Sequence, residues 1–252
     1  MKRFYSVSLA LAMFWSLCCS PLAFASAPAV NAPDRELSFA TITMGDEAMV
    51  IPVIVETSKQ QMRVTRSGGT YQDAVQTATY YIPATEEGIA YNNNYVQAAR
   101  FTVEATDQEL DPKHYITMTS TIRFTMYDSL DGTAKDSLLG LDNVSITRTK
   151  DPIGLDWDIL GVGNPTIEIK QVGMTDRGHG IIMGDGTWTG DQIKTYQNVS
   201  WGSPGVNVPS DWYPVMVRNY GTTGYFCNAT YTIMFQYSDG NQPCEFTHWV
   251  VK

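Results

Sequence analysis

The segment ITMTSTIRFTMY, residues 116–127, decides the fold class expected for this chain of 252 residues. Apolar side chains alternate there with threonine and arginine over most of its length. The apolar positions are Ile116, Met118, Ile122, Phe124 and Met126. Successive side chains of a β-strand point to opposite faces of the sheet, so this pattern buries one face and leaves the other in water. It is typical of a strand in an antiparallel sheet.

Strand patterns recur along the chain, whereas helical periodicity is scarce. Further candidate strands lie at residues 37–43, 49–55, 62–64, 75–82, 101–103, 144–148, 167–169, 193–201, 215–218, 226–237 and 246–251. A short helix is expected near residues 85–99, interrupted by the asparagines at 92–94. Pro52 cannot donate to a strand ladder and predicts an edge or a bulge. The fold predicted is all-β, an antiparallel β-sandwich of the immunoglobulin-like or jelly-roll-like kind.

Residues 1–27 predict a cleaved signal peptide. Lys2 and Arg3 precede an apolar stretch that is too short to span a bilayer as a helix, and small residues follow it up to the expected cleavage point after residue 27. The alternatives are an uncleaved anchor and a lipoprotein attached through Cys18 or Cys19. The expected location of the mature chain is therefore secreted, extracellular or in the cell envelope.

The mature chain is expected to form one domain. Residues 28–35 would be a short N-terminal tail, and residues 36–252 a single large β-sandwich domain. Two β domains divided near residues 136–152 are the alternative. After residue 27 no apolar run is long enough to cross a membrane, so no integral membrane segment is expected.

Charge argues against polyanionic partners. The chain has 17 basic and 26 acidic side chains, and cleavage would remove two of the basic ones. The remaining Lys and Arg are scattered singly, without the clusters that neutralise phosphate backbones. Nucleic acid and anionic membrane surfaces are therefore excluded as expected partners.

Two cysteines, Cys227 and Cys244, remain after cleavage, and an oxidising compartment favours a disulfide between them. The alternatives are two buried thiols and an intermolecular link. A tight hairpin centred on Asp239 and Gly240 would conflict with this bond, since it places Cys244 opposite Phe235, about 26 Å along the strand from Cys227. We therefore expect the bond to form and the strand to bend or break after Cys227.

Loop residues supply the candidate sites. A calcium site could use the carboxylates of one loop, Asp128, Asp131 and Asp136, with turn formation as the alternative reading. Surface recognition of a protein or glycan could use aromatic side chains in loops or at strand ends, and these would serve equally well as core residues. The aromatic candidates are Trp157, Trp188, Trp212 and Tyr213.

Catalytic motifs are scarce. His114, His179 and His248 are too far apart in sequence for a local metal motif, and no nucleophile elbow occurs. Carboxylate chemistry around Asp185 or in the loop of Asp128 leaves a secreted hydrolase as an alternative. The glycosylation sequons begin at Asn143, Asn198 and Asn228.

The sequence thus favours an exported, non-catalytic β protein that binds an extracellular or cell-envelope partner or a glycan. No cofactor is expected apart from calcium. A carboxylate-dependent hydrolase and a surface protein that self-assembles through strand edges are the alternatives.

Overall fold

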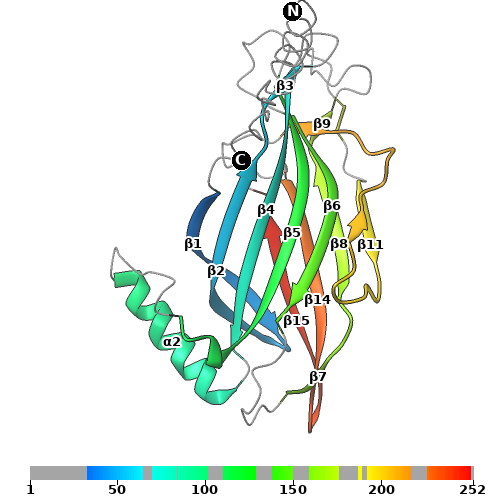
Figure 1. Ribbon diagram of the computed structural model, residues 1–252. Coiled ribbons are helices and arrows are strands. Elements are labelled where there is room, and N and C mark those ends of the chain that lie inside the picture. Colours follow the sequence, from blue (N-terminus) through cyan, green and yellow to red (C-terminus); the bar gives the residue numbers. More distant parts are fainter. Residues whose placement is uncertain are drawn as a thin grey trace, which may run out of the picture.

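The computed structural model describes residues 33–64, 70–83, 85–101, 110–128, 138–149, 159–175, 187–188, 192–216 and 226–250 (Figure 1). The signal peptide predicted at residues 1–27 and most of the predicted tail lie outside the described residues. So do Trp157, Asp131, Asp136 and Asp185.

Strands make up most of the described chain. The first group is β1 (Asp34–Met44), β2 (Glu47–Lys59), β3 (Arg63–Val64), β4 (Thr70–Pro83), β5 (Tyr115–Asp128), β6 (Leu138–Arg148), β7 (Ile159–Val162) and β8 (Thr166–Val172). The second is β9 (Met174–Thr175), β10 (Thr187–Trp188), β11 (Ile193–Tyr196), β12 (Val206–Asn207), β13 (Val215–Met216), β14 (Phe226–Tyr237) and β15 (Gly240–Trp249). The helix α2 (Glu86–Phe101) and the short 3-10 helix η2 (Pro112–His114) lie between β4 and β5.

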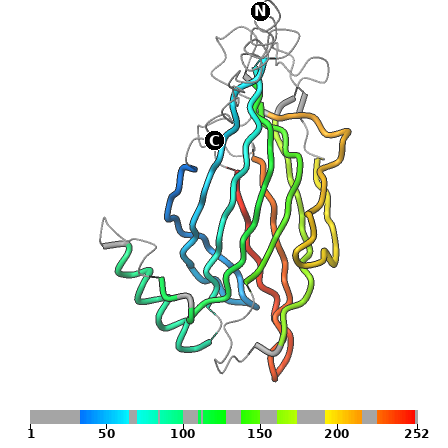
Figure 2. Tube along the Cα trace, viewed as in Figure 1, coloured from blue at the N-terminus to red at the C-terminus, as the bar shows by residue number. Residues whose placement is uncertain are grey.

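Thirteen of the strands hydrogen-bond into one antiparallel sheet. Its order is β11-β8-β14-β15-β1-β2-β4-β5-β6-β12, and β3, β7 and β13 attach to β4, β14 and β6. The sheet curls into a nearly closed, barrel-like shape (Figure 2). The prediction of an antiparallel all-β fold is confirmed, but the described residues do not display a sandwich of two stacked sheets.

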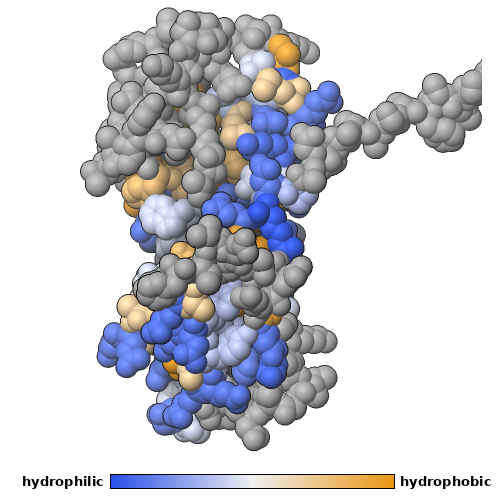
Figure 3. All heavy atoms as spheres, turned by 90° about the vertical axis from the view of Figure 1, so that its left-hand side faces the viewer, coloured by the Kyte–Doolittle hydropathy of each residue, from blue (hydrophilic) through white to orange (hydrophobic). Residues whose placement is uncertain are grey.

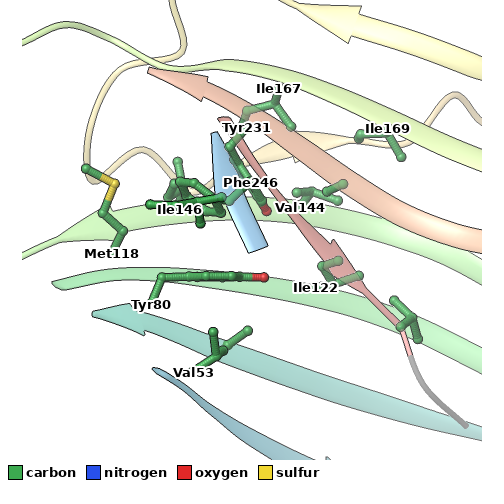
Figure 4. Close-up of a cluster of buried hydrophobic side chains, with 14 of the residues drawn as sticks. Val53, Tyr80, Met118, Ile122, Val144, Ile146, Ile167, Ile169, Tyr231 and Phe246 are labelled. Carbon is green, nitrogen blue, oxygen red and sulfur yellow. The ribbon is translucent and has the colours of Figure 1, made fainter. Parts of the chain in front are cut away.

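The inner face of this sheet holds the main core. Residues 116–127 lie within β5 as predicted, and their apolar positions point inward while their threonines point outward. Tyr80, Phe246 and Tyr231 fill the centre, with ring centroids 4.4 Å apart for Tyr80 and Phe246 and 5.2 Å for Tyr231 and Phe246 (Figure 4). The contact of Tyr80 with Phe246 joins β4 to β15, which are far apart in sequence, so side chains fill the space inside the curled sheet.

Helix α2 packs on the outer face of the sheet, with a second small cluster beneath it that includes Ile54, Tyr95 and Tyr115. The three asparagines do not interrupt the helix, because Asn92 is buried and its Nδ2 donates to the Val50 carbonyl at 2.9 Å. That carbonyl belongs to the part of β2 that β4 leaves uncovered, since β2 and β4 pair only from Val53 onward. Pro52 lies at this boundary, so the predicted local edge is found.

Two buried glutamine side chains bridge the seam between β6 and β8. Gln171 accepts from the Leu141 N–H at 2.6 Å through Oε1 and donates to the Tyr213 carbonyl at 2.7 Å. Gln192 accepts from the Tyr213 N–H at 2.8 Å and donates to the Gln171 carbonyl at 3.0 Å. Side-chain amides thus replace the backbone ladder that would close the sheet.

The hairpin of β14 and β15 corrects two predictions. Its turn is at Ser238 and Asp239, so Cys244 lies opposite Ile233 rather than Phe235. β14 continues without a break to Cys227, about 20 Å along the strand from Ile233. A disulfide needs Cα atoms within about 7 Å of each other. The predicted disulfide is therefore absent, and Cys227 and Cys244 are two buried thiols.

No helix in the described part of the chain is both long enough and apolar enough to cross a membrane.

Candidate functional site

A pocket of about 700 Å³ opens on the inner face of the sheet at the end where β1 begins, and we call it the β1 pocket. Its β1 lining comes from Asp34, Arg35, Glu36 and Ser38. Its remaining lining comes from Val55, Thr57 and Lys59 of β2, Gln76 of β4, and Phe124 and Met126 of β5. Four strands that span more than ninety residues of sequence therefore build one concave surface.

Strand alternation explains this lining. Asp34, Glu36 and Ser38 share the parity of the buried Ile42, so their side chains lie on the inner face of β1. Most strands are filled by apolar groups on this face, but the first residues of β1 are polar or charged. The core therefore stops short of this end of the sheet, and the pocket lies where it stops.

The floor and the mouth of the β1 pocket differ in chemistry. Phe124 and Val55 give the floor an apolar surface, while Asp34, Glu36 and Lys59 are exposed at the mouth. Within the described residues none of these three charged side chains forms an ion pair. Figure 3 views the molecule from the side on which α2 and β1 lie, where the described surface is mostly hydrophilic with smaller hydrophobic areas. Arg35, the other charged residue of the lining, is paired with Glu56 at 3.3 Å, so the charges without an ion-pair partner at the mouth are two carboxylates and one ammonium.

Behind the pocket, a chain of hydrogen bonds runs through the core. Gln76 Nε2 donates to Thr57 Oγ1 at 3.1 Å, which turns Gln76 Oε1 toward His248 Nε2 at 3.0 Å. His248 Nδ1 lies 2.7 Å from Ser120 Oγ, and Ser120 Oγ also contacts the Tyr231 hydroxyl. Gln76 and Thr57 line the β1 pocket, so the network connects the centre of the core to the pocket wall.

The direction of each bond follows from the protonation of His248. Burial lowers the pKa of His248 to about 3, so the ring is neutral at pH 7 and carries one proton. Because Gln76 Oε1 can only accept, that proton lies on Nε2, and Nδ1 accepts from the Ser120 hydroxyl. Ser120 in turn accepts from Tyr231. The hydroxyl of Ser120 is fully engaged and only its neighbours in the core reach it, so this Ser–His pair stabilises the barrel-like sheet rather than forming an accessible nucleophile.

A second polar group lies on the outer face of the sheet. Thr125 Oγ1 is 3.1 Å from Asp73 Oδ1 and 3.0 Å from Asp142 Oδ2. Partial burial raises the pKa of Asp142, and the nearby Asp73 carboxylate raises it further, while the Thr125 hydrogen bond opposes this shift. Two carboxylates therefore lie beside each other and share one threonine hydroxyl, although their sequence positions gave no motif.

The aromatic candidates have different environments. Trp212 is half-buried and packs against the main core. Tyr213 has 41% of its surface exposed, while its backbone takes part in the glutamine seam. Trp188 belongs to β10, which pairs with β9 in a separate two-stranded sheet; its side chain and all of Trp157 lie outside the described residues.

Sequence reasoning missed another exposed aromatic pair on the outer face of β14 and β15. Trp249 has 53% of its surface exposed and meets Phe226 edge-on, with ring centroids 5.7 Å apart. Alternation with buried neighbours could have shown that each of these side chains points outward. Only the register of the hairpin, however, shows that the two lie next to each other.

The predicted calcium site is not tested by the described residues. Asp128 ends β5, its side chain is not described, and Asp131 and Asp136 lie outside the described ranges. Elsewhere in the described part of the chain, no group of three His, Cys, Asp or Glu side chains is arranged to hold a metal ion.

The sequons differ in accessibility. Asn228 is buried, and Asn143 is half-buried with its Nδ2 donating to Asn207 Oδ1 at 2.9 Å. Asn198 is exposed in a loop, with a left-handed φ of 55°. Glycan attachment needs an accessible acceptor, so Asn198 is the best placed of the three.

Comparisons of this chain with family models, curated proteins and solved structures gave no match.

Proposed function

We propose that this chain is an exported, non-catalytic binding protein that takes an extracellular or cell-envelope partner into the β1 pocket. One observation carries the proposal: a concave site of about 700 Å³ combines an apolar floor with three exposed charged side chains that have no ion-pair partner among the described residues. Ligand sites of proteins usually combine an apolar concave surface with a few polar groups that fix orientation, and the mouth of a barrel is a common place for them.

The polar network behind the pocket supports binding rather than turnover. His248 is neutral at pH 7, and the hydroxyl of Ser120 is held by His248 and Tyr231 within the core. These groups fix Gln76 and Thr57, which form part of the pocket wall. A wall held from behind by satisfied hydrogen bonds keeps its shape when the ligand leaves, which lowers the entropic cost of binding.

The test is a binding screen with a pocket-filling variant. Mature protein, residues 28–252, is applied to glycan and peptide arrays. The affinity of every ligand found is then measured for the wild type and for the variants Ser38→Trp and Thr43→Trp. Ser38 lines the pocket, whereas Thr43 is exposed on the opposite face of the same strand. We expect Ser38→Trp to weaken binding at least about tenfold and Thr43→Trp to leave it unchanged. Binding that survives Ser38→Trp, with both variants folded, would place the site elsewhere.

A second function, carboxylate-dependent hydrolysis, is favoured by the Asp73–Thr125–Asp142 group. Glycoside hydrolysis uses two neighbouring carboxyl groups, one of which has a raised pKa, and burial raises the pKa of Asp142. Release of reducing sugar from a polysaccharide panel, abolished by Asp142→Asn but retained in Asp239→Asn, an exposed aspartate in the turn between β14 and β15, would support this function. No turnover by the wild type would exclude it for the substrates used.

A further inference from the structure

The backbone of β1 has one edge that another strand could use. In an antiparallel pair, alternate residues direct both their N–H and C=O groups to the same neighbour. The tight turn at Gly45 and Asp46 makes Met44 and Glu47 a bonded pair, so the even-numbered residues of β1 face β2. The odd-numbered residues face the side of β15, as the bond from Gly45 N to Pro243 O at 2.8 Å confirms.

β15 uses this edge only at its lower end. The two strands pair at Thr43↔Glu245 and Met44↔Cys244, near the turn between β1 and β2, and not beyond (Figure 2). Further along β15, the carbonyl of Thr247 accepts a hydrogen bond from the Tyr80 hydroxyl at 3.0 Å. A side chain from the opposite wall therefore occupies a position that a neighbouring strand would fill.

As a result, the N–H and C=O groups of Leu37, Phe39 and Thr41 have no backbone partner among the described residues. Open edges of this kind pair readily with extended chains, and soluble proteins usually guard them with charges, proline or bulges. No charge, proline or bulge guards the centre of this edge. Phe39 at the centre is uncharged and 38% exposed, and β1 pairs with β2 without a register shift.

The open edge and the β1 pocket belong to the same strand. Residues with unpaired backbone groups, Leu37 and Phe39, alternate with Glu36 and Ser38, whose side chains line the pocket. A peptide strand added to β1 would have the same alternation, so every second side chain would point toward the pocket. Main-chain bonds would give affinity, and the pocket would select the inward side chain.

We propose that the partner of this site is an extended peptide segment that adds as a strand to the open edge of β1 and places a basic side chain between Asp34 and Glu36. This proposal rests on the proposed binding function and names its partner class. The charge of the site selects the occupant. Arg35 also lines the pocket, but its guanidinium is paired with Glu56 at 3.3 Å, so the carboxylates of Asp34 and Glu36 face one further cation, the ammonium of Lys59.

Charge also argues against a second copy of this chain in the groove. The formal charge is −9 at pH 7, so two copies repel each other, whereas a basic segment is attracted to both the site and the whole molecule. The inward side chain next to the basic one would face the apolar floor at Val55 and Phe124, which favours an aliphatic residue there.

Three synthetic peptides test the proposal on the mature chain. The first is an octapeptide of alternating threonine and valine with one central lysine on the side that faces the pocket, and the second has glutamate in place of that lysine. The third is the lysine peptide with alternate backbone nitrogens methylated, which removes the N–H donors of the added strand. Affinity is measured by calorimetry, and backbone protection by amide hydrogen exchange. We expect the lysine peptide to bind at least about tenfold more tightly than the glutamate peptide and to protect the amides of Leu37, Phe39 and Thr41. The methylated peptide should not bind.

Variants separate the charge from the strand edge. Asp34→Asn with Glu36→Gln should remove the preference for lysine, while Glu47→Gln, an exposed carboxylate at the other end of the hairpin, should keep it. If a ligand binds in a manner sensitive to Ser38→Trp without protecting those three amides, the proposed function stands and strand addition is wrong. Protection that rises with protein concentration in the absence of peptide would show self-pairing and overturn the choice of partner.

Discussion

His248 stabilises the fold only while its ring is neutral. The ring is buried between Ser120 and Gln76, and the network satisfies both nitrogens in the neutral form. An imidazolium there would have to donate from Nδ1 as well, toward a hydroxyl that is already directed at it. Burial of the ring and the direction of the hydrogen bonds therefore both oppose its protonation.

The folded protein should lose stability in mild acid because of this histidine. Its pKa is about 3 when folded and about 6.5 when unfolded, so below pH 6.5 the unfolded chain binds a proton that the folded chain does not. The stability it contributes is complete above pH 6.5, and falls by up to about 1.4 kcal/mol per pH unit toward pH 3. Urea unfolding at pH 7, 6, 5 and 4 measures this slope.

His248→Gln supplies the control for the acid experiment. Glutamine retains hydrogen-bonding groups but does not titrate, so its free energy of unfolding should vary less between pH 7 and pH 4 than that of the wild type. Burial raises the pKa of Asp142, so the folded protein binds a proton there more readily than the unfolded chain does. Asp142 therefore stabilises the fold as pH falls, which is opposite to the effect of His248. Equal slopes in the two proteins would show that His248 does not carry the effect.

The two thiols should be unreactive in the folded protein. Burial raises the pKa of Cys227, and burial together with Glu245 raises the pKa of Cys244 to about 12. Thiolate is the reactive form, so alkylation of a native chain of residues 28–252 should add no label, and alkylation of the same chain in denaturant should add two. If that chain takes no label in denaturant unless it is first reduced, the disulfide exists.

At the scale of elements, the side chain of Asn92 makes a polar contact between helix α2 and strand β2 of the sheet. Asn92→Ala removes the donor that meets the Val50 carbonyl, at an expected cost of about 1–3 kcal/mol in the free energy of unfolding. Asn93→Ala, one position away and exposed, should change stability by less than about 0.5 kcal/mol. Chemical denaturation compares them, and equal values would mean that the interior contact contributes nothing.

Some elements could be read from sequence because their signals are local. The alternation in residues 116–127 gave β5, the region near residues 85–99 gave α2, and Pro52 marked a break in the pairing of β2. The register of the last hairpin was missed, because Ser238, Asp239 and Gly240 allow turns at adjacent positions and a shifted turn moves every partner. The disulfide prediction was wrong for a separate reason: it required a bend or break after Cys227, whereas β14 continues through that residue.

The site could not be predicted because it depends on contacts between distant strands. Nothing local distinguishes Gln76 from an exposed glutamine, and its burial follows from the packing of β4 against β2 and of His248 against Ser120. The open edge of β1 likewise depends on how far β15 follows it. The spacing of apolar residues in a single sequence predicts neither the burial of Gln76 nor the length over which β15 pairs with β1.

At the scale of the whole molecule, closure of the sheet depends on the glutamine seam. Gln171→Leu leaves the Leu141 N–H unpaired between β6 and β8, and should cost about 1–3 kcal/mol. Gln97→Leu on the exposed side of α2 is the matched control and should be nearly neutral. Denaturant midpoints measure both, and a stable Gln171→Leu protein would show that the seam needs no amide bridge.

The function proposed for the molecule depends on the part of the sheet that does not close, which is the edge of β1 beyond its short pairing with β15. Residue-resolved amide exchange in a chain of residues 28–252 without ligand tests this feature most directly. Leu37, Phe39 and Thr41 should exchange at least about tenfold faster than Ser38, Ala40 and Ile42, whose amides bond to β2. Uniform protection along β1 would contradict the account, because it would mean that another strand already occupies the edge.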